Sequence, residues 1–251
     1  MHCLNVSSYR FVLLEDLPAL RDRLKAAAEA AGLRGTVLLA SEGINLFLAG
    51  PPEAVRAWLA GLRKDPRFAG LDAKESFSDE QPFKKLKVKI KREIIRMNRP
   101  AVQPQQGRAP SVAPVTLARW LAQGHDDEGR EVVMLDTRNA FEVEFGAFER
   151  AIDWKLRKFS DFPAALEAYA SELEGKTVVS YCTGGIRCEK AALLMLEAGL
   201  SSTYQLEGGI LRYFEQTEGA PGYRGNCFVF DERESLEPGL LPAHVPPPAA
   251  S

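Results

Sequence analysis

The stretch from 100 to 114, PAVQPQQGRAPSVAP, divides the chain into two parts and constrains its fold more than any other feature. Prolines, glutamines and small residues at this density favour an extended linker over a helix or a strand. The 251 residues are enough for two modest domains, each with its own core. We therefore predict a domain over 1–99, a linker over 100–114, a second domain over 115–220 and a C-terminal extension over 221–251.

The first part of the chain follows a β-α-β-β-α-β pattern. Leucines and alanines recur at helical spacing after residue 17, and Gly32 supplies a C-cap. A second helix begins at Pro51 and Pro52, because proline suits the first helical turn. The strands are expected at 9–14, 36–40, 44–49 and 71–77, and the first helix at 17–31. This order predicts a ferredoxin-like, acylphosphatase-like α+β domain with a sheet packed on two helices.

Strands and helices alternate again after the linker. Strands are expected at 132–135, 177–181 and 203–206, and helices around 117–121 and at 163–173 and 189–198. This alternation predicts an α/β domain with a parallel sheet. In such sheets the functional residues gather beyond the C-terminal ends of the strands. Asp136 and Cys182 both stand at such ends.

A lysine-rich stripe accounts for the positive charge of the first domain. Residues 1–99 hold 18 basic and 12 acidic residues, and 84–99 alone hold eight basic residues and one acid. The alternation predicts that Leu86, Val88 and Ile90 face a core while the lysines share the other face. Such a stripe matches an RNA backbone, but it also suits an edge strand that avoids sheet-to-sheet pairing. The candidate RNA-binding residues are Lys84, Lys85, Lys87, Lys89, Lys91 and Arg92.

The segment from 178 to 190, VVSYCTGGIRCEK, carries the clearest chemical signal. Cys182 ends a buried strand, and a glycine-bearing turn then leads directly into a helix. Backbone N–H groups of such a turn converge on the sulfur, and the helix N-terminus adds positive potential. Both effects favour a nucleophilic thiolate, so Cys182 is the candidate catalytic residue. The candidate anion-binding loop consists of Thr183, Gly184, Gly185, Ile186 and Arg187.

Three further residues are candidates for a supporting role. Cys188 either resolves an oxidised or persulfidated Cys182 or is a small packing residue of the first helical turn. Asp136 and Arg138 either shape the pocket and its electrostatics or form a salt bridge at the strand end. The sequence leaves these alternatives open.

Several motifs together resemble known proteins. The loop CTGGIRCEKA, the run 135–138 followed by Phe141 and Glu142, and LEGGI at 206–210 resemble a rhodanese-like domain. Four residues separate Cys182 from Arg187, as in sulfur-handling rhodaneses, whereas the related phosphatases have five. The runs ASEGIN at 40–45, PFKKLKV at 82–88 and CFVFDER at 227–233 resemble the bacterial tRNA uridine(34) hydroxylases, over about residues 4 to 235.

The resemblance implies an oxidoreductase that modifies tRNA, forming 5-hydroxyuridine at the wobble position with molecular oxygen as co-substrate. It also implies that Cys182 is the essential cysteine and that tRNA is the partner. Longer family members continue with paired cysteines that suggest a metal-binding tail. Here the chain continues as PAHVPPP from Pro242, for which we expect disorder, and Cys227 lacks a nearby ligand partner, so we expect no metal site there.

The sequence contains no binding motif for an oxygen-activating cofactor. The run His125-Asp126-Asp127 contains the H-x-D part of a facial iron triad, but it stands in a polar turn from Gly124 to Gly129, for which we expect a solvated loop. No G-x-G-x-x-G run follows a strand, and a dinucleotide site is therefore unsupported. The sequence contains no metal-binding or flavin-binding motif, and the cofactor of the reaction is therefore unknown.

Three features of the sequence indicate the cellular compartment. The four cysteines are too few and too unevenly spaced for a disulfide scaffold. The first residues, MHCLNVSSYRF, do not read as a secretion signal, and no apolar run approaches the roughly 20 residues that span a bilayer. We expect a cytoplasmic protein without a membrane partner.

Two other functions compete with the hydroxylase. A rhodanese-type sulfurtransferase would carry a persulfide on Cys182 to an acceptor. A non-enzymatic RNA-binding module would keep the loop only as a vestige. The intact loop disfavours the RNA-binding module, and the lysine stripe mildly disfavours the sulfurtransferase.

Overall fold

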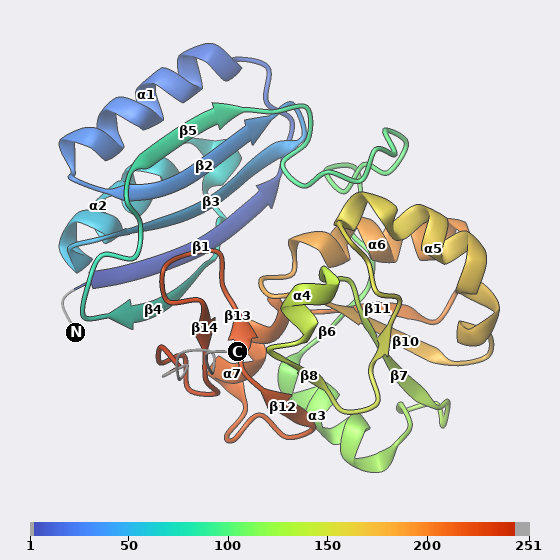
Figure 1. Cartoon of the computed structure of the whole chain (residues 1–251). Coiled ribbons are helices and arrows are strands. Elements are labelled where there is room, and N and C mark those ends of the chain that lie inside the picture. The colour runs from blue at the N-terminus through green and yellow to red at the C-terminus, as the bar shows by residue number, and fades with distance from the viewer. Residues whose placement is uncertain (1–2, 244–251) are drawn as a thin grey trace, which may run out of the picture.

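The first part of the chain folds around a five-stranded sheet, here called sheet A, with the order β4-β1-β3-β2-β5. The computed structural model describes residues 3–243 (Figure 1). The strands are β1 (Cys3–Phe11), β2 (Arg34–Ala40), β3 (Gly43–Gly50), β4 (Ala73–Ser78) and β5 (Leu86–Ile90). Helices α1 (Leu17–Ala30) and α2 (Pro52–Arg63) pack on one face of sheet A, where their apolar stripes form a single core with the strands. The predicted ferredoxin-like fold is confirmed.

Two elements of this domain differ from their prediction. The first strand begins at Cys3 rather than at Tyr9, because β3 and β4 pair with it on both sides along most of its length. The pattern of polar and apolar residues there reflects two covered faces, which conceals the strand period. The fifth strand, β5, adds to the edge of sheet A in parallel with β2.

The face of sheet A opposite the helices, here called the open face, carries a continuous row of side chains across all five strands. The pairings Lys74–Ser7, Ser7–Phe47, Phe47–Thr36 and Thr36–Lys87 are each in register. Residues in register on neighbouring strands point to the same face. Lys74 on one edge strand and Lys87 on the other therefore share the open face.

The edge strand β5 only partly matches its prediction. Leu86 and Val88 pack against the core as expected, but Ile90 is exposed, so the prediction that it faces a core is wrong. Ile90 stands at the end of this edge strand, in register with Leu39. Lys87 and Lys89 are exposed on the open face, in register with Thr36 and Leu38.

The second part of the chain folds around a parallel sheet, here called sheet B, with the order β6-β11-β10-β7-β9. Its strands are β6 (Ser111–Val112), β7 (Val132–Asp136), β9 (Ile152–Asp153), β10 (Thr177–Tyr181) and β11 (Thr203–Leu206). One core lies between sheet B and helices α3 (Pro114–Gln123) and α7 (Gly209–Gln216), and another beneath α5 (Phe162–Tyr169) and α6 (Ile186–Glu197). The predicted rhodanese-like α/β architecture is confirmed.

Three segments of the second part carry structure that the sequence did not predict. The stretch 100–114 buries Val102 and Ala109 in a core and supplies β6. A short helix, α4 (Ala140–Val143), and a strand, β8 (Gly146–Phe148), follow β7. The C-terminal extension forms β12 (Tyr223–Gly225), β13 (Cys227–Phe228) and β14 (Ser235–Leu236). The expected disorder after Pro242 falls largely outside the described residues.

A buried ion network joins the two domains. Lys190 of α6 is 1 % exposed, and its Nζ lies 2.8 Å from Glu42, 2.7 Å from Glu93 and 3.0 Å from the Ile95 carbonyl oxygen. Glu42 also accepts the backbone N–H of Ile94. A buried ammonium needs partners of this kind, so the network fixes sheet A against α6.

Within residues 3–243, no helix has the length and apolar content that a membrane crossing requires.

Candidate active site

Cys182 stands at the end of β10, where the whole strand is buried. Its side chain is also buried, and the backbone N–H of Gly185 donates to Sγ at 3.1 Å. Gly185 has φ +96°, a left-handed conformation that glycine adopts without a steric cost. The turn can therefore curl around the sulfur before α6 begins at Ile186.

The loop rests on the N-terminus of α7. The backbone N–H of Ile210 donates to the Cys182 carbonyl oxygen at 3.0 Å, and that of Leu211 donates to Thr183 at 3.1 Å. Gly209 has φ +67°, and a Cβ atom there would lie 2.4 Å from the Cys182 carbonyl oxygen. Only glycine fits, which gives the GG pair of the LEGGI run a physical role: it lets α7 support the loop.

The surroundings of Cys182 stabilise its thiolate. Burial raises the pKa of Cys182, but a hydrogen bond from Cys188, the charge of Arg187 and backbone N–H groups of Arg187 and Gly185 outweigh it and lower that pKa to about 5. Burial and the neighbouring Cys182 hold the pKa of Cys188 well above its ordinary value, so Cys188 keeps its proton. Cys182 is therefore the ionised, nucleophilic sulfur of the pair at neutral pH.

Arg187 is held by a carboxylate that the sequence did not single out as a site residue. Its Nη1 and Nη2 lie 2.6 and 2.8 Å from the two carboxylate oxygens of Glu142, and both side chains are buried. Burial raises the pKa of Glu142, but Arg187 outweighs it and keeps the carboxyl ionised. Such a two-point pair fixes the guanidinium beside Cys182.

Asp136 and Arg138 pair with each other away from the sulfur. Both are buried, and Arg138 Nη2 lies 2.6 Å from Asp136 and 2.7 Å from the Gly146 carbonyl oxygen. Neither side chain lines the cavity described below. The pair joins the end of β7 to β8. Thr137, between them, donates to the Tyr181 carbonyl oxygen and lies 3.7 Å from the sulfur of Cys188.

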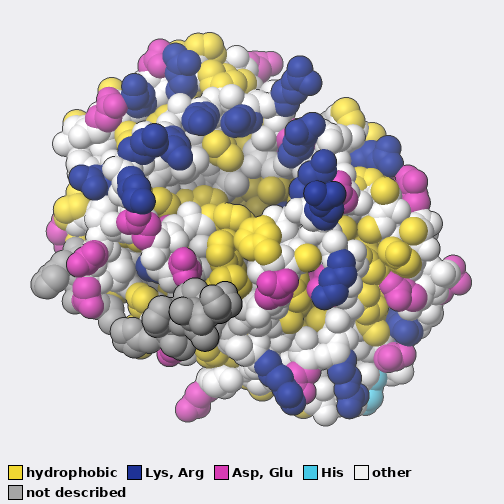
Figure 2. Space-filling model, viewed as in Figure 1, with side chains coloured by type: hydrophobic (Ala, Val, Ile, Leu, Met, Phe, Trp, Pro, Cys, Tyr) yellow, Lys and Arg dark blue, Asp and Glu magenta, His cyan; other side chains and the backbone are white. Residues whose placement is uncertain are grey.

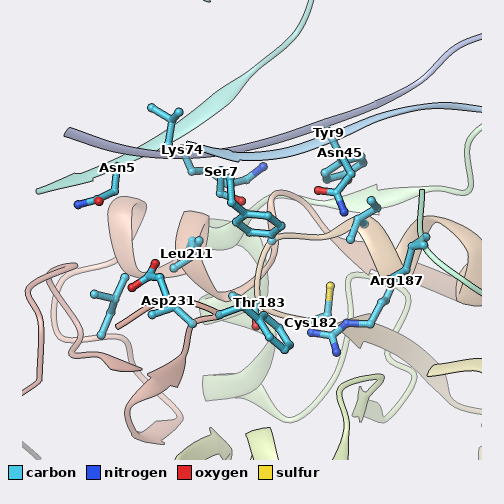
Figure 3. Close-up of a pocket in the computed structure, with 18 of the residues that line it drawn as sticks. Asn5, Ser7, Tyr9, Asn45, Lys74, Cys182, Thr183, Arg187, Leu211 and Asp231 are labelled. Carbon is cyan, nitrogen blue, oxygen red and sulfur yellow. The ribbon is translucent and has the colours of Figure 1, made fainter. Parts of the chain in front are cut away.

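A cavity of about 450 Å³ separates the open face of sheet A from the Cys182 loop. Figure 3 shows Tyr9, Asn45 and Lys74 on the sheet side, and Cys182 and Arg187 on the opposite side. Figure 2 shows apolar side chains gathered in a hollow between the domains, with Lys and Arg side chains above it. The cavity lining includes Asn5, Ser7, Phe47, Ser76, Thr183, Gly184, Ile186, Leu211, Phe230, Asp231 and Arg233.

The structure brings some of the predicted site residues together and leaves others apart. Cys182, Thr183, Gly184, Ile186 and Arg187 all line the cavity. The six predicted RNA-binding residues lie outside it, and all six are exposed. Of these, Lys84 pairs with Glu232 at 2.9 Å.

Three comparisons place these domains among known proteins. Residues 3–94 match the family model described as the UPF0176 acylphosphatase like domain, and residues 117–216 match the rhodanese-like domain. A tRNA uridine(34) hydroxylase of Bordetella avium is 62% identical over 242 residues, which is 96% of this chain and 100% of that protein. A tRNA uridine(34) hydroxylase of Cupriavidus taiwanensis is 59% identical over 97% of this chain and 86% of that protein.

The chain belongs to the tRNA uridine(34) hydroxylase family. The family resemblance inferred from the sequence motifs is thereby confirmed. Among solved structures, the rhodanese-like domain of an Anabaena protein aligns with a TM-score of 0.37 and 20% identity over 46% of this chain and 79% of that chain. An acylphosphatase from Coxiella burnetii aligns with a TM-score of 0.28 and 16% identity over 35% of this chain and 92% of that chain.

This family member offers no ready metal site within the part of the chain that the structure describes. No group of three or more His, Cys, Asp or Glu side chains there is arranged to hold a metal ion. His125 contacts the backbone oxygen of Asp126. The expected solvated loop is wrong for Asp126, which is buried and accepts hydrogen bonds from Thr177 and from two backbone N–H groups. Through these backbone contacts, with Glu128 and Arg130, Asp126 closes the turn that follows it.

Sequence reasoning missed two residues of this site. Glu142 entered the sequence analysis only as part of a motif, although an arginine beside a buried strand end requires an anionic partner. The sequence around Lys74 did not indicate a site residue, because a lysine among Ser, Glu and Phe in a short strand is typical of an exposed edge. Only the packing of the second domain against the open face buries Lys74.

Proposed function

We propose that this protein hydroxylates uridine at position 34 of tRNA, with molecular oxygen as co-substrate, and that Cys182 acts on the base. Membership of the hydroxylase family supports the reaction. One observation carries the role of the cysteine: a buried sulfur, ionised at neutral pH, faces a cavity between the two domains. Because tRNA is modified where it is made and used, we place the reaction in the cytoplasm.

The size and position of the cavity fit a single extruded nucleotide. Its volume of about 450 Å³ falls in the range of roughly 300 to 1,000 Å³ that is typical of small-molecule sites. Enzymes that modify a base take it out of the stack into such a pocket, and this costs least for a base that is already single-stranded. Position 34 lies in the anticodon loop and satisfies that condition.

The lysine stripe supplies a path for the tRNA backbone. Lys87 and Lys89 lie on the same face of sheet A as the cavity, at the opposite edge from Lys74. Four strand spacings of about 4.8 Å separate Lys74 from Lys87, a span of roughly 19 Å. We propose that phosphates next to residue 34 contact Lys85, Lys87 and Lys89, and that Lys91 and Arg92 extend this contact.

A complementation experiment tests the assignment. A bacterial strain without its own hydroxylase gene, and without a redundant pathway, would carry the wild-type gene, Cys182→Ser or the control Cys3→Ala. Cys3 is buried in β1, away from the cavity, so it controls for the loss of a buried thiol. Mass spectrometry of tRNA nucleosides would measure 5-hydroxyuridine and the nucleosides derived from it.

The outcomes separate the competing functions. We expect the wild type and Cys3→Ala to restore 5-hydroxyuridine and Cys182→Ser to restore none. Restoration by Cys182→Ser would remove the cysteine from the mechanism. A wild-type gene that restores nothing, while the purified protein transfers sulfur from thiosulfate to a thiol, would favour the sulfurtransferase.

A further inference from the structure

Lys74 is a largely buried lysine whose amine has no polar partner among the described residues. The residue is 7 % exposed, and it makes no hydrogen bond or ion pair with any residue between 3 and 243. It lines the cavity, and its Nζ lies 5.3 Å from the centre of the Tyr9 ring. Buried polar groups normally have partners, and one that lacks them calls for an explanation.

The cost of this burial is visible in the pKa of Lys74. Burial lowers that pKa, and the charge of Arg212 lowers it further, while Asp72, Cys182 and Glu215 act in the opposite direction without contacting the amine. An ammonium held in this way gains interaction energy when an oxygen atom arrives in the cavity. Lys74 is thus a donor prepared for a ligand.

The cavity places this donor opposite the nucleophile. Figure 3 shows Lys74 on the sheet A side and Cys182 on the loop side of the same space. Uracil has an electrophilic carbon, C6, that is conjugated through C5 to the carbonyl oxygen O4. A thiolate that adds to C6 therefore sends negative charge to O4. A donor at O4 stabilises the charge where it develops.

We propose that Lys74 is a second catalytic residue, which donates a hydrogen bond to uracil O4 while the Cys182 thiolate adds to C6. This inference rests on the proposed function, because it takes uridine 34 as the substrate. It assigns to the first domain a part in the chemistry as well as in tRNA binding.

The proposed step balances without an oxidant. A sulfur lone pair forms the S–C6 bond, the C5–C6 π pair shifts to C4–C5, and the carbonyl π pair moves onto O4. The enolate then takes a proton from water at C5, which restores the carbonyl. Loss of a proton from C5 and departure of the thiolate from C6 reverse the sequence. The enzyme should therefore exchange the C5 hydrogen of uridine 34 with solvent in the absence of oxygen.

Hydrogen exchange tests the proposal directly. The full-length protein would be incubated without oxygen in heavy water with a tRNA transcript that carries uridine at position 34, and nuclease fragments would be weighed by mass spectrometry. We expect one deuterium at C5 of uridine 34. Lys74→Met should slow this exchange by about 10² to 10³-fold at saturating tRNA, as loss of one charge-stabilising donor does elsewhere. Affinity for tRNA should stay unchanged.

Two further variants complete the experiment. Lys25→Met makes the same change at an exposed position of α1, beyond the other face of sheet A, and should exchange like the wild type. Lys74→Arg keeps a cationic donor and should exchange faster than Lys74→Met. Its rate should also persist to higher pH than that of the wild type, because an arginine keeps its proton. A defect in folding alone would not shift this pH profile.

Several results would overturn the inference. Exchange by Lys74→Met at the wild-type rate would remove Lys74 from the chemistry. Normal exchange at saturating tRNA, with weaker tRNA binding and a shallower salt dependence, would make Lys74 a phosphate contact instead. A wild-type protein that restores 5-hydroxyuridine in cells but exchanges no deuterium would contradict this inference without contradicting the proposed function.

Discussion

Glu142 and Arg187 form a buried two-point ion pair beside the sulfur of Cys182, with distances of 2.6 and 2.8 Å. The pair links α4 of the second domain to the first turn of α6, so it holds the end of the Cys182 loop in place. A lone arginine at this position would carry a large desolvation cost. The pair therefore explains how a buried cation can lie next to Cys182.

Glu142→Gln should destabilise the protein because it leaves Arg187 without its counter-charge. Removing one partner of a buried ion pair costs about 3 to 5 kcal/mol, and urea unfolding would measure the loss. Glu149→Gln is the matched control, since it breaks an exposed pair with Arg224 and should cost far less. Equal losses in the two variants would contradict the role given to Glu142.

Cys182 should titrate far below an ordinary thiol. Ultraviolet absorbance of the thiolate, taken as the difference between the wild type and Cys182→Ser, should rise with a midpoint near pH 5. A midpoint near the usual value of about 8.5 would show that the loop does not stabilise the thiolate.

The same ionisation should make stability depend on pH. The pKa of Cys182 is lower in the folded than in the unfolded chain, so its ionisation stabilises the fold fully above the unfolded value of about 8.5. This contribution is lost as the pH falls through about 5. The free energy of unfolding of the wild type, relative to Cys182→Ser, should therefore decrease from pH 9 towards pH 5. A pH-independent difference would argue against the lowered pKa.

The lysine stripe should contribute a salt-dependent part of tRNA binding. Replacing Lys85, Lys87 and Lys89 with Ala should weaken binding and reduce the slope of log affinity against log salt by about 2, given roughly 0.7 per phosphate contact on a single strand. Arg23, Lys25 and Arg56 are exposed basic residues of α1 and α2, and their replacement with Ala should leave the slope unchanged. Equal slopes for the stripe variant and the wild type would make the stripe a protected sheet edge.

Lys190→Met should weaken the contact between the two domains. The variant removes the cation that Glu42 and Glu93 share and leaves both carboxylates partly buried. We expect a stability loss of about 3 kcal/mol or more in urea unfolding, together with a loss of hydroxylation, because the cavity walls belong to different domains. A stable variant with full activity would show that the network does not hold the cavity together.

The sequence predicted both folds and the strand-turn-helix that carries Cys182, because local patterns specify them. The helical spacing from Leu17 to Ala28 and the strand-turn-helix around Cys182 need no knowledge of distant residues. The cavity was not predictable in this way. It depends on the second domain packing on the open face of sheet A, which brings Lys74 and Tyr9 near Cys182 across more than 100 residues of sequence.

The supporting residues illustrate the same limit. Asp136 and Arg138 were singled out from their place near a strand end, and Cys188 from its place six residues after Cys182, but the sequence could not tell which side chain turns toward the sulfur. The structure pairs Asp136 with Arg138 and buries Cys188, whose sulfur lies 3.7 Å from the Thr137 hydroxyl. Partner choice among buried charges is a tertiary property, and a single sequence leaves it open.

The central claim is that the base at position 34 enters the cavity between sheet A and the Cys182 loop. Photochemical crosslinking measures this directly, with a tRNA that carries 4-thiouridine only at position 34 and with peptide mapping of the product. The account predicts crosslinks within the cavity lining, on residues such as Tyr9, Phe47 or Thr183, that unlabelled tRNA competes away. Crosslinks confined to the helix-covered side of sheet A, on α1 or α2, would contradict it.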